Sequence, residues 1–293
     1  MVDPAVEVLL AIASGDTERA ADLAARATGD LCAALAIHLE ARVDAVHTVY
    51  DEARAFQAFI SHGSNPLLYE RTIASISRTQ RRTQPRSVLD IGCGDGRISA
   101  ASRAPSVTRL DLVEPAAAML AEARDRLGDA IDVHCHGETV ECFLAESAGR
   151  WDLAQATFSM HNLEPASRPA VWHDLARRTR TLLICEFDVP SFPDRSEAHC
   201  RYLAERYAVG IAEYADHPEV VQGFLMPVLV GQVALDAAPR YTFEQPVARW
   251  REELEAAGFS VTRERVFSYW WADAWMLVGE STVSGDEGEV GGL

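Results

Sequence analysis

Between residues 87 and 189, short strand-like runs alternate with amphipathic helical patterns along the chain. The strand-like runs lie at 87–92, 107–114, 130–135, 151–159 and 181–189, and the helical patterns lie around 96–104, 115–127, 139–148 and 164–178. A helix between successive strands is the crossover that parallel pairing requires. The sequence therefore predicts an α/β fold whose parallel sheet carries helices on both faces.

The remaining segments extend this pattern at both ends and interrupt it once. Residues 1–80 look helical throughout, since apolar positions between Leu35 and Ile60 recur every three or four residues. Residues 190–244 contain five prolines and a helix whose apolar face carries Cys200, Leu203, Tyr207, Ile211 and Tyr214. A helix at 246–257 and two strands at 259–270 and 274–280 follow, and these two strands predict an antiparallel hairpin at the sheet edge.

We therefore divide the chain into four parts. These are an N-terminal helical lid (1–80), a sheet core (81–189 and 245–280), a helical cap insertion for the substrate (190–244) and a disordered polar tail (281–293).

Charge and composition exclude several classes of function. With 27 basic and 44 acidic residues the net charge is −17, which repels nucleic-acid phosphates. The chain contains no lysine, so a Schiff base on lysine and a Walker A phosphate loop are both excluded. No apolar stretch is long enough to predict a membrane span. The N-terminus has no basic segment and carries Asp3, so we expect no signal peptide and a cytoplasmic protein.

The cysteines and histidines do not predict a metal site. None of the six cysteines forms a C-x-x-C pair, and we expect them to be reduced thiols. His134, Cys135 and His136, with Cys142 nearby, lie on a predicted strand. Because side chains alternate across a strand, Cys135 faces away from the two histidines and the three cannot converge on one ion.

A glycine-rich loop is the sharpest local signal. Asp90-Ile91-Gly92-Cys93-Gly94-Asp95-Gly96 spans the junction of the first strand and the next helix, where bare backbone and free N–H groups can approach a ligand. Arg97 stands where the dinucleotide fingerprint has its third glycine, which here comes one residue early. Asp90 would repel a pyrophosphate but suits an ammonium or sulfonium group. The loop therefore disfavours a nicotinamide dinucleotide and favours a cationic ligand.

Two acidic residues farther along the chain indicate more closely which kind of ligand this is. Glu114 ends the second strand, where an acid accepts hydrogen bonds from a ribose diol. Gly137-Glu138 follows the third strand, where a carboxylate can accept the exocyclic amine of adenine. Together with Asp90, these residues predict a cationic adenosyl ligand.

At this point the sequence resembles the class I S-adenosylmethionine-dependent methyltransferases over 85–189 and 245–280. The D-I-G-C-G-D-G loop, Glu114, the Gly137-Glu138 pair, the W-D-L-A run of the fourth strand and the closing hairpin carry the resemblance. It implies a Rossmann-like doubly wound sheet, mostly parallel with an antiparallel last strand, and S-adenosyl-L-methionine as cofactor.

The resemblance also implies a set of cofactor contacts. Asp90 takes the methionine amino group, Gly92 and Gly94 approach the methionine part, and Glu114 holds the ribose hydroxyls. Arg71, after the Asn65-Pro66 turn, pairs with the methionine carboxylate. Glu138 and Thr139 border the adenine, and Thr157 lies beside the cofactor. Tyr69, Cys93 and Pro115 are further expected cofactor contacts.

The acceptor must be inferred from the strand ends, because the cofactor itself supplies the electrophile. His161, just past the fourth strand, is a candidate general base. Glu186 or Asp188 of the fifth strand could orient an acceptor amine or hydroxyl. The N/D-P-P-aromatic run of base-amine methyltransferases is absent. With the acidic charge, this predicts a small-molecule acceptor, in specialised metabolism.

The sequence leaves two other functions open. One is attack on the aminobutyrate arm of the same cofactor, which would release methylthioadenosine, and the other is a non-catalytic regulator that binds the cofactor. The acceptor molecule, its reacting atom (O, N or C) and the role of the N-terminal helices are not determined by the sequence. A homodimer is compatible with it.

Overall fold

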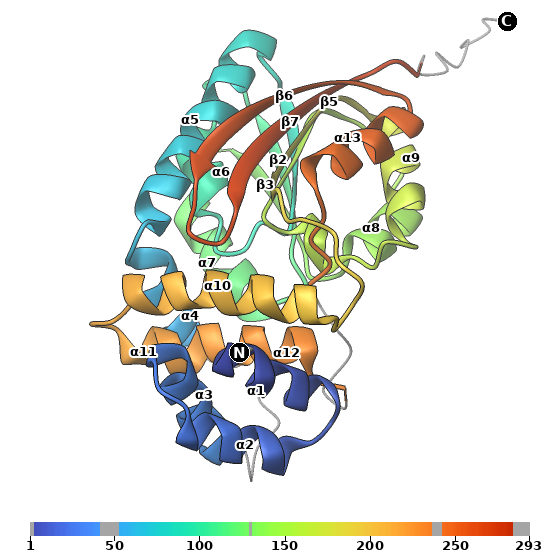
Figure 1. Cartoon of the computed structure of the whole chain (residues 1–293). Coiled ribbons are helices and arrows are strands. Elements are labelled where there is room, and N and C mark those ends of the chain that lie inside the picture. The colour runs from blue at the N-terminus through green and yellow to red at the C-terminus, as the bar shows by residue number, and fades with distance from the viewer. Residues whose placement is uncertain (1–2, 42–52, 129–130, 236–241, 284–293) are drawn as a thin grey trace, which may run out of the picture. The chain divides into compact units, whose positions relative to one another are not determined.

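The computed structural model describes residues 3–41, 53–128, 131–235 and 242–283 (Figure 1). The chain forms two compact units, each built from separate segments. A helical unit comprises Met1–Leu68, Pro190–Thr242 and Tyr269–Ala272, and a sheet unit comprises Tyr69–Val189, Phe243–Ser268 and Asp273–Leu293.

The sheet unit contains seven strands in the order β3-β2-β1-β4-β5-β7-β6. The strands are β1 (Ser87–Ile91), β2 (Arg109–Val113), β3 (Asp132–His136), β4 (Trp151–Thr157), β5 (Thr179–Phe187), β6 (Phe259–Ser268) and β7 (Asp273–Ser281). The first five are parallel, and β7 lies antiparallel between β5 and β6. This confirms the predicted Rossmann-like sheet with its antiparallel last strand and edge hairpin.

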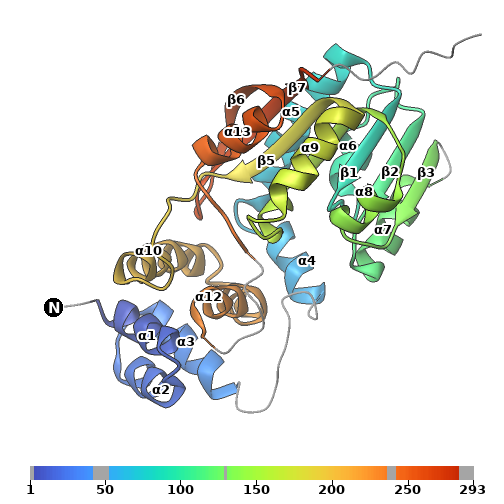
Figure 2. The same cartoon turned by 90° about the vertical axis from the view of Figure 1, so that its right-hand side faces the viewer.

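Helices cover both faces of this sheet (Figures 1 and 2). The helices on one face are α5 (Asn65–Thr83), α6 (Arg97–Ser102) and α7 (Ala117–Leu127), and those on the other are α8 (Val140–Glu146), α9 (Arg168–Arg178) and α13 (Val247–Ala256). Figure 2 shows α8 and α9 in front of the strands. Each face has its own apolar core: Leu153 belongs to the core under α5 and α6, and its neighbour Ala154 belongs to the core under α9 and α13.

The central strands are nearly continuous apolar runs because both of their faces are buried. The register pairs Ile91 with both Val113 and Ala156, and Thr157 with Cys185. The carboxyl ends of β1, β2, β4 and β5 therefore lie together at one edge of the sheet, which is where ligands bind in folds of this kind.

The helical unit collects its helices from both sides of the sheet sequence. They are α1 (Pro4–Ala13), α2 (Thr17–Arg26), α3 (Asp30–Ala41), α4 (Ala53–Ser61), α10 (Glu197–Glu213), α11 (Pro218–Val220), the π-helical turn η3 (Val221–Leu225) and α12 (Met226–Val233). Asp16 caps α2 by accepting from the Arg19 N–H at 3.1 Å. The predicted apolar face of the insertion helix is buried in α10, where Cys200, Leu203 and Tyr207 are all within the core.

A buried polar cluster ties three segments of this unit together. The Tyr269 hydroxyl donates to Asn65 Oδ1 at 2.9 Å, and Asn65 Nδ2 donates to the Tyr214 hydroxyl at 2.6 Å. Ser64 donates through both its backbone N–H and its hydroxyl to Glu213, at 2.8 and 2.7 Å. The start of α5, the end of α10 and the tip of the β6–β7 hairpin are thus joined inside the helical unit.

Some boundaries differ from the predicted ones. The division between the units falls between Leu68 and Tyr69, inside α5, whereas the sequence predicted a lid through residue 80. Ser281, predicted to begin a disordered tail, ends β7 and donates to the Ala176 carbonyl at 2.6 Å. Residues 284–293 of that predicted tail lie outside the described residues, as do 42–52 of the predicted lid. None of the described helices is long and apolar enough to cross a membrane.

We expect Tyr269→Phe to lower the free energy of unfolding by about 1–3 kcal/mol, because it removes a hydroxyl from a buried hydrogen bond. Tyr202→Phe is the matched control, since its half-buried hydroxyl donates to the Trp271 carbonyl at a longer 3.2 Å. Urea unfolding of the full chain measures both. Equal midpoints for Tyr269→Phe and the unsubstituted protein would contradict the role given to the cluster.

Candidate functional site

The three loop glycines adopt left-handed backbone angles for different reasons. A Cβ at Gly92 would collide with the side chain of Ser159, and one at Gly96 would lie 2.8 Å from Cβ of Ala123. A Cβ at Gly94, with φ +54°, would meet only the end of Met119 at 3.6 Å. Gly92 and Gly96 are therefore required by packing inside the protein. Gly94 is the position where the backbone is open to a ligand.

Glu114, at the end of β2, is held against this loop. Its Oε2 accepts from the Gly94 N–H at 3.1 Å, and its Oε1 accepts from the Ala116 N–H at 2.9 Å. Glu114 is half-buried. Two backbone donors thus fix a carboxylate beside Gly94, which is the placement expected for a group that accepts from a ribose diol.

Asp90 lies beneath the loop and is only 1% exposed. One carboxylate oxygen accepts from the Ser99 hydroxyl at 2.6 Å, and that hydroxyl in turn accepts from Gln155 at 2.9 Å. The other oxygen, Oδ1, has no hydrogen-bond partner among the described residues. Burial raises the pKa of Asp90 to about 6, helped by the nearby charge of Glu114 and opposed by the Ser99 and Gln155 hydrogen bonds. An unpartnered buried carboxylate oxygen is a fitting acceptor for a ligand ammonium group.

The other residues expected at the cofactor lie at the same sheet edge, except Arg71, which is described below. Cys93 and Thr157 are each 9% exposed, Pro115 is exposed, and Glu138 is half-buried. Thr139 caps α8 by accepting from the Cys142 N–H at 3.4 Å.

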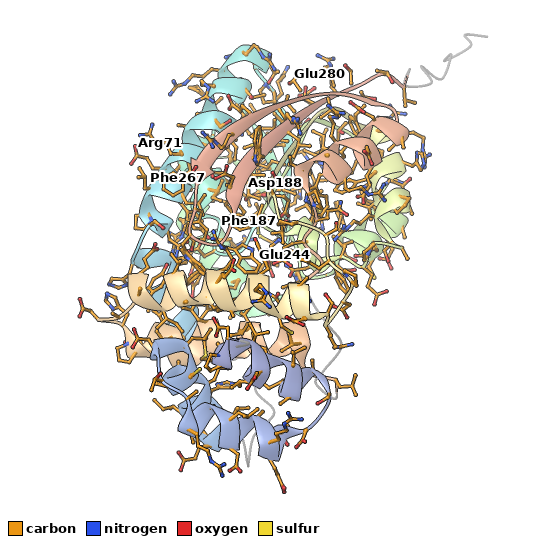
Figure 3. All side chains as sticks on the ribbon, viewed as in Figure 1. Arg71, Phe187, Asp188, Glu244, Phe267 and Glu280 are labelled. Atoms are coloured by element: carbon orange, nitrogen blue, oxygen red, sulfur yellow. The ribbon has the colours of Figure 1, made fainter. Side chains whose placement is uncertain are left out.

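The two cofactor contacts expected on α5, Tyr69 and Arg71, lie on different sides of the helix. Tyr69 is half-buried, with the Arg97 guanidinium 5.7 Å from its ring centroid, so it lies beside the glycine loop. Arg71 is exposed, and Figure 3 shows it on the outer side of α5. The structure therefore does not bring Arg71 to the loop, because the buried face of this helix is occupied by Thr72, which lies 3.8 Å from Cys185.

His161 and Glu186, predicted as separate candidates, form a pair. His161 lies in the short 3₁₀ turn η2 (Met160–Asn162) after β4, and its Nδ1 is 2.8 Å from Oε2 of Glu186 on β5. Glu186 is 1% exposed, and its Oε1 accepts from the backbone N–H groups of Met160 and His161 at 2.8 and 3.2 Å. Three donors thus stabilise one buried carboxylate, which fixes the imidazole at the ends of β4 and β5.

The surroundings of His161 favour its protonated form. Burial by itself lowers the pKa of His161, but the charge and hydrogen bond of Glu186 and the charge of Glu244 outweigh it, and Arg168 opposes them. The pKa of His161 is therefore raised. The imidazole accepts and retains a proton at higher pH than an ordinary histidine.

Arg168 and the Phe243 backbone complete this region and were not predicted from the sequence. Arg168 is fully buried, with its guanidinium 4.3 Å from the Trp250 ring centroid, and it donates to the Phe243 carbonyl at 2.5 Å. The Phe243 N–H in turn donates to the His161 carbonyl at 2.6 Å. Residue 243 is therefore held from both sides, which keeps Glu244 close enough to act on His161.

Phe158 is a second group that the sequence patterns gave no reason to select. It follows β4 with φ +53°, a left-handed conformation that bulky side chains rarely adopt. Its ring stacks on Phe187 with centroids 4.8 Å apart and lies 6.3 Å from the Tyr69 ring. In Figure 3, Phe187 lies at the same end of the sheet as Glu244, and Glu280 lies at the other end.

The residues weighed as metal ligands have other partners. His134 is 2.9 Å from Asp132, and His136 is 3.2 Å from Asp111. Within the described part of the chain, no three His, Cys, Asp or Glu side chains are arranged to hold an ion. All six cysteines fall in that part and are free thiols.

Comparisons with known proteins agree with this geometry. A family model for a methyltransferase domain matches residues 88–181. The ubiquinone biosynthesis O-methyltransferase of Azotobacter vinelandii is 35% identical over 100 residues, which is 33% of this chain and 42% of that protein. The chain thus matches less than half the length of this curated relative.

Solved structures show the fold. The crystal structure of SCL7 from Oryza sativa is 14% identical, covers 95% of this chain and 100% of its own, and has a TM-score of 0.63. Magnesium protoporphyrin IX methyltransferase from Synechocystis, solved with bound S-adenosylhomocysteine, is 15% identical, with coverage of 74% and 84% and a TM-score of 0.50.

Residues 88–181 therefore form a class I S-adenosylmethionine-dependent methyltransferase domain, and the resemblance in the sequence is confirmed. The cofactor of this family is S-adenosylmethionine.

The middle and last glycines of the loop, Gly94 and Gly96, should respond differently to alanine. Both substitutions impose a left-handed conformation that costs about 1–2 kcal/mol, but only Gly96→Ala adds a clash with Ala123. We expect Gly96→Ala to lower the melting temperature more than Gly94→Ala does. Gly94→Ala should weaken S-adenosylhomocysteine binding by roughly tenfold or more, measured by calorimetry. Equal affinities for Gly94→Ala and the unsubstituted protein would show that no ligand approaches Gly94.

Proposed function

We propose that the protein transfers a methyl group from S-adenosylmethionine to a small-molecule acceptor, and that His161, oriented by Glu186, takes the acceptor's proton. The observation that carries the proposal is the pairing of the half-buried His161 with the buried Glu186 at the ends of β4 and β5, in a chain whose residues 88–181 match a methyltransferase domain. Support for a small-molecule acceptor comes from the net charge of −17 and from the relative named for O-methylation in ubiquinone biosynthesis.

The residues present fit the cofactor. Gly94 leaves the backbone open, Glu114 offers a fixed carboxylate to the ribose, and Asp90 has a buried oxygen without a partner in the described structure. Tyr69, Thr157 and Glu138 are the further residues that we assign to this site. When bound, S-adenosylmethionine supplies an electrophilic methyl group on sulfonium sulfur, so the protein itself must orient an acceptor and remove a proton.

The His161–Glu186 pair is suited to that proton transfer. With Nδ1 as the donor to Glu186, the Nε2 atom is the basic one. Two backbone N–H groups and the imidazole donate to Glu186. As the imidazole takes the proton, the carboxylate stabilises the imidazolium, and this is the same interaction that raises the pKa of His161.

The experiment that tests this function identifies the product nucleoside. The full chain is incubated with S-adenosylmethionine and a metabolite extract free of protein and nucleic acid, and the products are analysed by mass spectrometry. We expect S-adenosylhomocysteine, and we expect His161→Gln to reduce its formation by about 10²–10⁴-fold. Methylthioadenosine as the product would indicate attack on the aminobutyrate arm. Cofactor binding without any turnover would indicate a regulator.

Glu186→Gln should lower the pKa of His161. The substitution removes the negative charge that raises this pKa and leaves the burial that lowers it. Proton NMR titration of the His161 ring measures the change, with His161→Gln identifying the signal. The unsubstituted protein should titrate above the ordinary histidine value of about 6.5, and Glu186→Gln below the unsubstituted value. His136→Gln, which alters another half-buried histidine, should leave the signal unchanged. An identical titration in Glu186→Gln would rule out the proposed coupling.

Glu114→Ala should weaken S-adenosylhomocysteine binding by roughly tenfold to a hundredfold, since hydrogen bonds to a charged group contribute about 1.5–3 kcal/mol. Glu114→Gln keeps one acceptor and should lose less. Calorimetry measures the affinity, and circular dichroism verifies folding. Glu141→Ala, at an exposed position on α8, is the control. A folded Glu114→Ala protein with unchanged affinity would remove Glu114 from the ribose site.

A further inference from the structure

We infer that the acceptor is an uncharged, planar aromatic hydroxyl compound, and that it stacks against the ring pair Phe158–Phe187. This inference rests on the proposed function, because it names the class of acceptor for the same site. Four features of the sheet unit support it: the conformation of Phe158, the position of the ring pair, the basicity of His161 and the charge of the surroundings.

Phe158 is held in an unfavourable conformation by its neighbours. Its N–H donates to the Cys185 carbonyl at 2.9 Å, and the hydroxyl of the next residue, Ser159, donates to the Ile91 carbonyl at 2.8 Å. These two bonds tie the chain to β5 and β1 on either side of β4. The left-handed backbone at φ +53° is thereby maintained and directs the ring onto Phe187. A bulky residue kept in this conformation is characteristic of functional sites.

The ring pair and the basic pair flank the same two strand ends. Phe158 and His161 both follow β4, and Phe187 and Glu186 are successive residues at the end of β5. Successive side chains of a strand point to opposite faces. Glu186 thus faces His161, whereas Phe187 faces Phe158 and the α5 side of the sheet, with Tyr69 beyond. An acceptor lying across these strand ends can stack on a ring and reach the imidazole.

The basicity of His161 selects the kind of hydroxyl. A phenol ionises near pH ~10, close enough to a histidine of raised pKa for proton transfer during the reaction. Bulk water, which an aliphatic hydroxyl resembles, has a pKa of about 15.7, which lies far from that of His161. In the reaction the acceptor oxygen bonds to the methyl carbon as the carbon–sulfur bond breaks. The electron pair of that bond stays on sulfur, and the hydroxyl proton passes to Nε2 of His161.

The charges around this edge disfavour an anionic acceptor. Glu114, Glu186 and Glu244 supply negative charge near the strand ends, and the chain has no lysine. Arg97 is paired with Asp95 at 2.7 Å. Arg168 is enclosed beside Trp250 and is fully buried. A carboxylated or phosphorylated acceptor would therefore meet net repulsion here.

Three probes of matched size test the inference: 2-naphthol, its saturated analogue decahydro-2-naphthol, and the anionic 6-hydroxy-2-naphthoate. Binding to the full chain loaded with S-adenosylhomocysteine is measured by calorimetry, and S-adenosylhomocysteine formation is measured with S-adenosylmethionine. We expect 2-naphthol to bind at least tenfold more tightly than either analogue and to be the probe that is methylated. Equal binding of the saturated analogue, or tighter binding of the naphthoate, would overturn the inference.

Phe187→Leu provides the matching variant. It should weaken 2-naphthol binding by about threefold to tenfold through loss of ring stacking, and it should leave S-adenosylhomocysteine affinity unchanged. Phe259→Leu is the control. Phe259, the first residue of β6, is also a buried ring, but it packs against Gly279 of β7 and not against the Phe158–Phe187 pair. This substitution should lower stability without altering probe binding. Unchanged 2-naphthol binding by Phe187→Leu would remove Phe187 from the acceptor site.

The two proposals fail in different ways. If S-adenosylhomocysteine forms with acceptors of the metabolite extract but 2-naphthol neither binds nor reacts, the aromatic acceptor is wrong and the methyltransferase function stands. If no S-adenosylhomocysteine forms from any source, or methylthioadenosine forms instead, the proposed function is wrong and this inference falls with it.

Discussion

Parallel pairing of β4 with β1 on one side and β5 on the other fixes the positions of the His161–Glu186 pair and the Phe158–Phe187 pair. The register sets Ile91 beside Ala156 and Thr157 beside Cys185, so β1 and β4 end close together while β5 continues to Phe187. The segments that leave these strands must then share a small space. Ser159 bonds to the end of β1, Phe158 bonds to β5, and the backbone of η2 bonds to Glu186. A shift of β5 by one residue would exchange the faces of Glu186 and Phe187 and separate both from their partners.

Buried charge is the main energetic cost of this arrangement, and each charged group is compensated in a different way. Glu186 receives three donors, which offset the loss of water around the carboxylate. Arg168 donates to the Phe243 carbonyl, lies over the Trp250 ring and is 3.9 Å from the Glu253 carboxylate, while its Nε and Nη1 have no hydrogen-bond partner among the described residues. Asp90 is only partly compensated, and burial raises its pKa to about 6. Glu186 is therefore the most fully hydrogen-bonded of the three charged groups, whereas Asp90 and Arg168 each keep buried polar atoms without a partner in the described structure.

The glycine loop shows that one motif can combine structural and functional requirements. Gly92 and Gly96 make room for Ser159 and Ala123, respectively, so they are needed whether or not a ligand is present. Gly94 lies between them, where a Cβ would meet only Met119 at 3.6 Å, and Glu114 accepts from its N–H. Packing at Gly92 and Gly96 therefore holds the loop rigid. Gly94, between them, has its backbone accessible to a ligand. Such a preorganised loop binds a ligand without the entropic cost of ordering the chain.

The sequence by itself determined the fold and the cofactor loop, because both depend on local patterns. Alternating strand and helix periodicity specified the sheet, and the spacing of Asp90, the glycines and Glu114 indicated the kind of ligand. Sequence reasoning also selected His161 and Glu186, but as separate residues, since they are 25 positions apart and only the β4–β5 register brings them together. Nothing in the sequence distinguished Arg71 from Tyr69, and only the packed face of α5 separated them. Phe158, Arg168 and Glu244 carry no local signal, because their positions follow from hydrogen bonds between distant segments. The tertiary structure alone decided which side chains share the edge of the sheet, since long-range strand pairing and buried-charge compensation are not encoded in any local pattern.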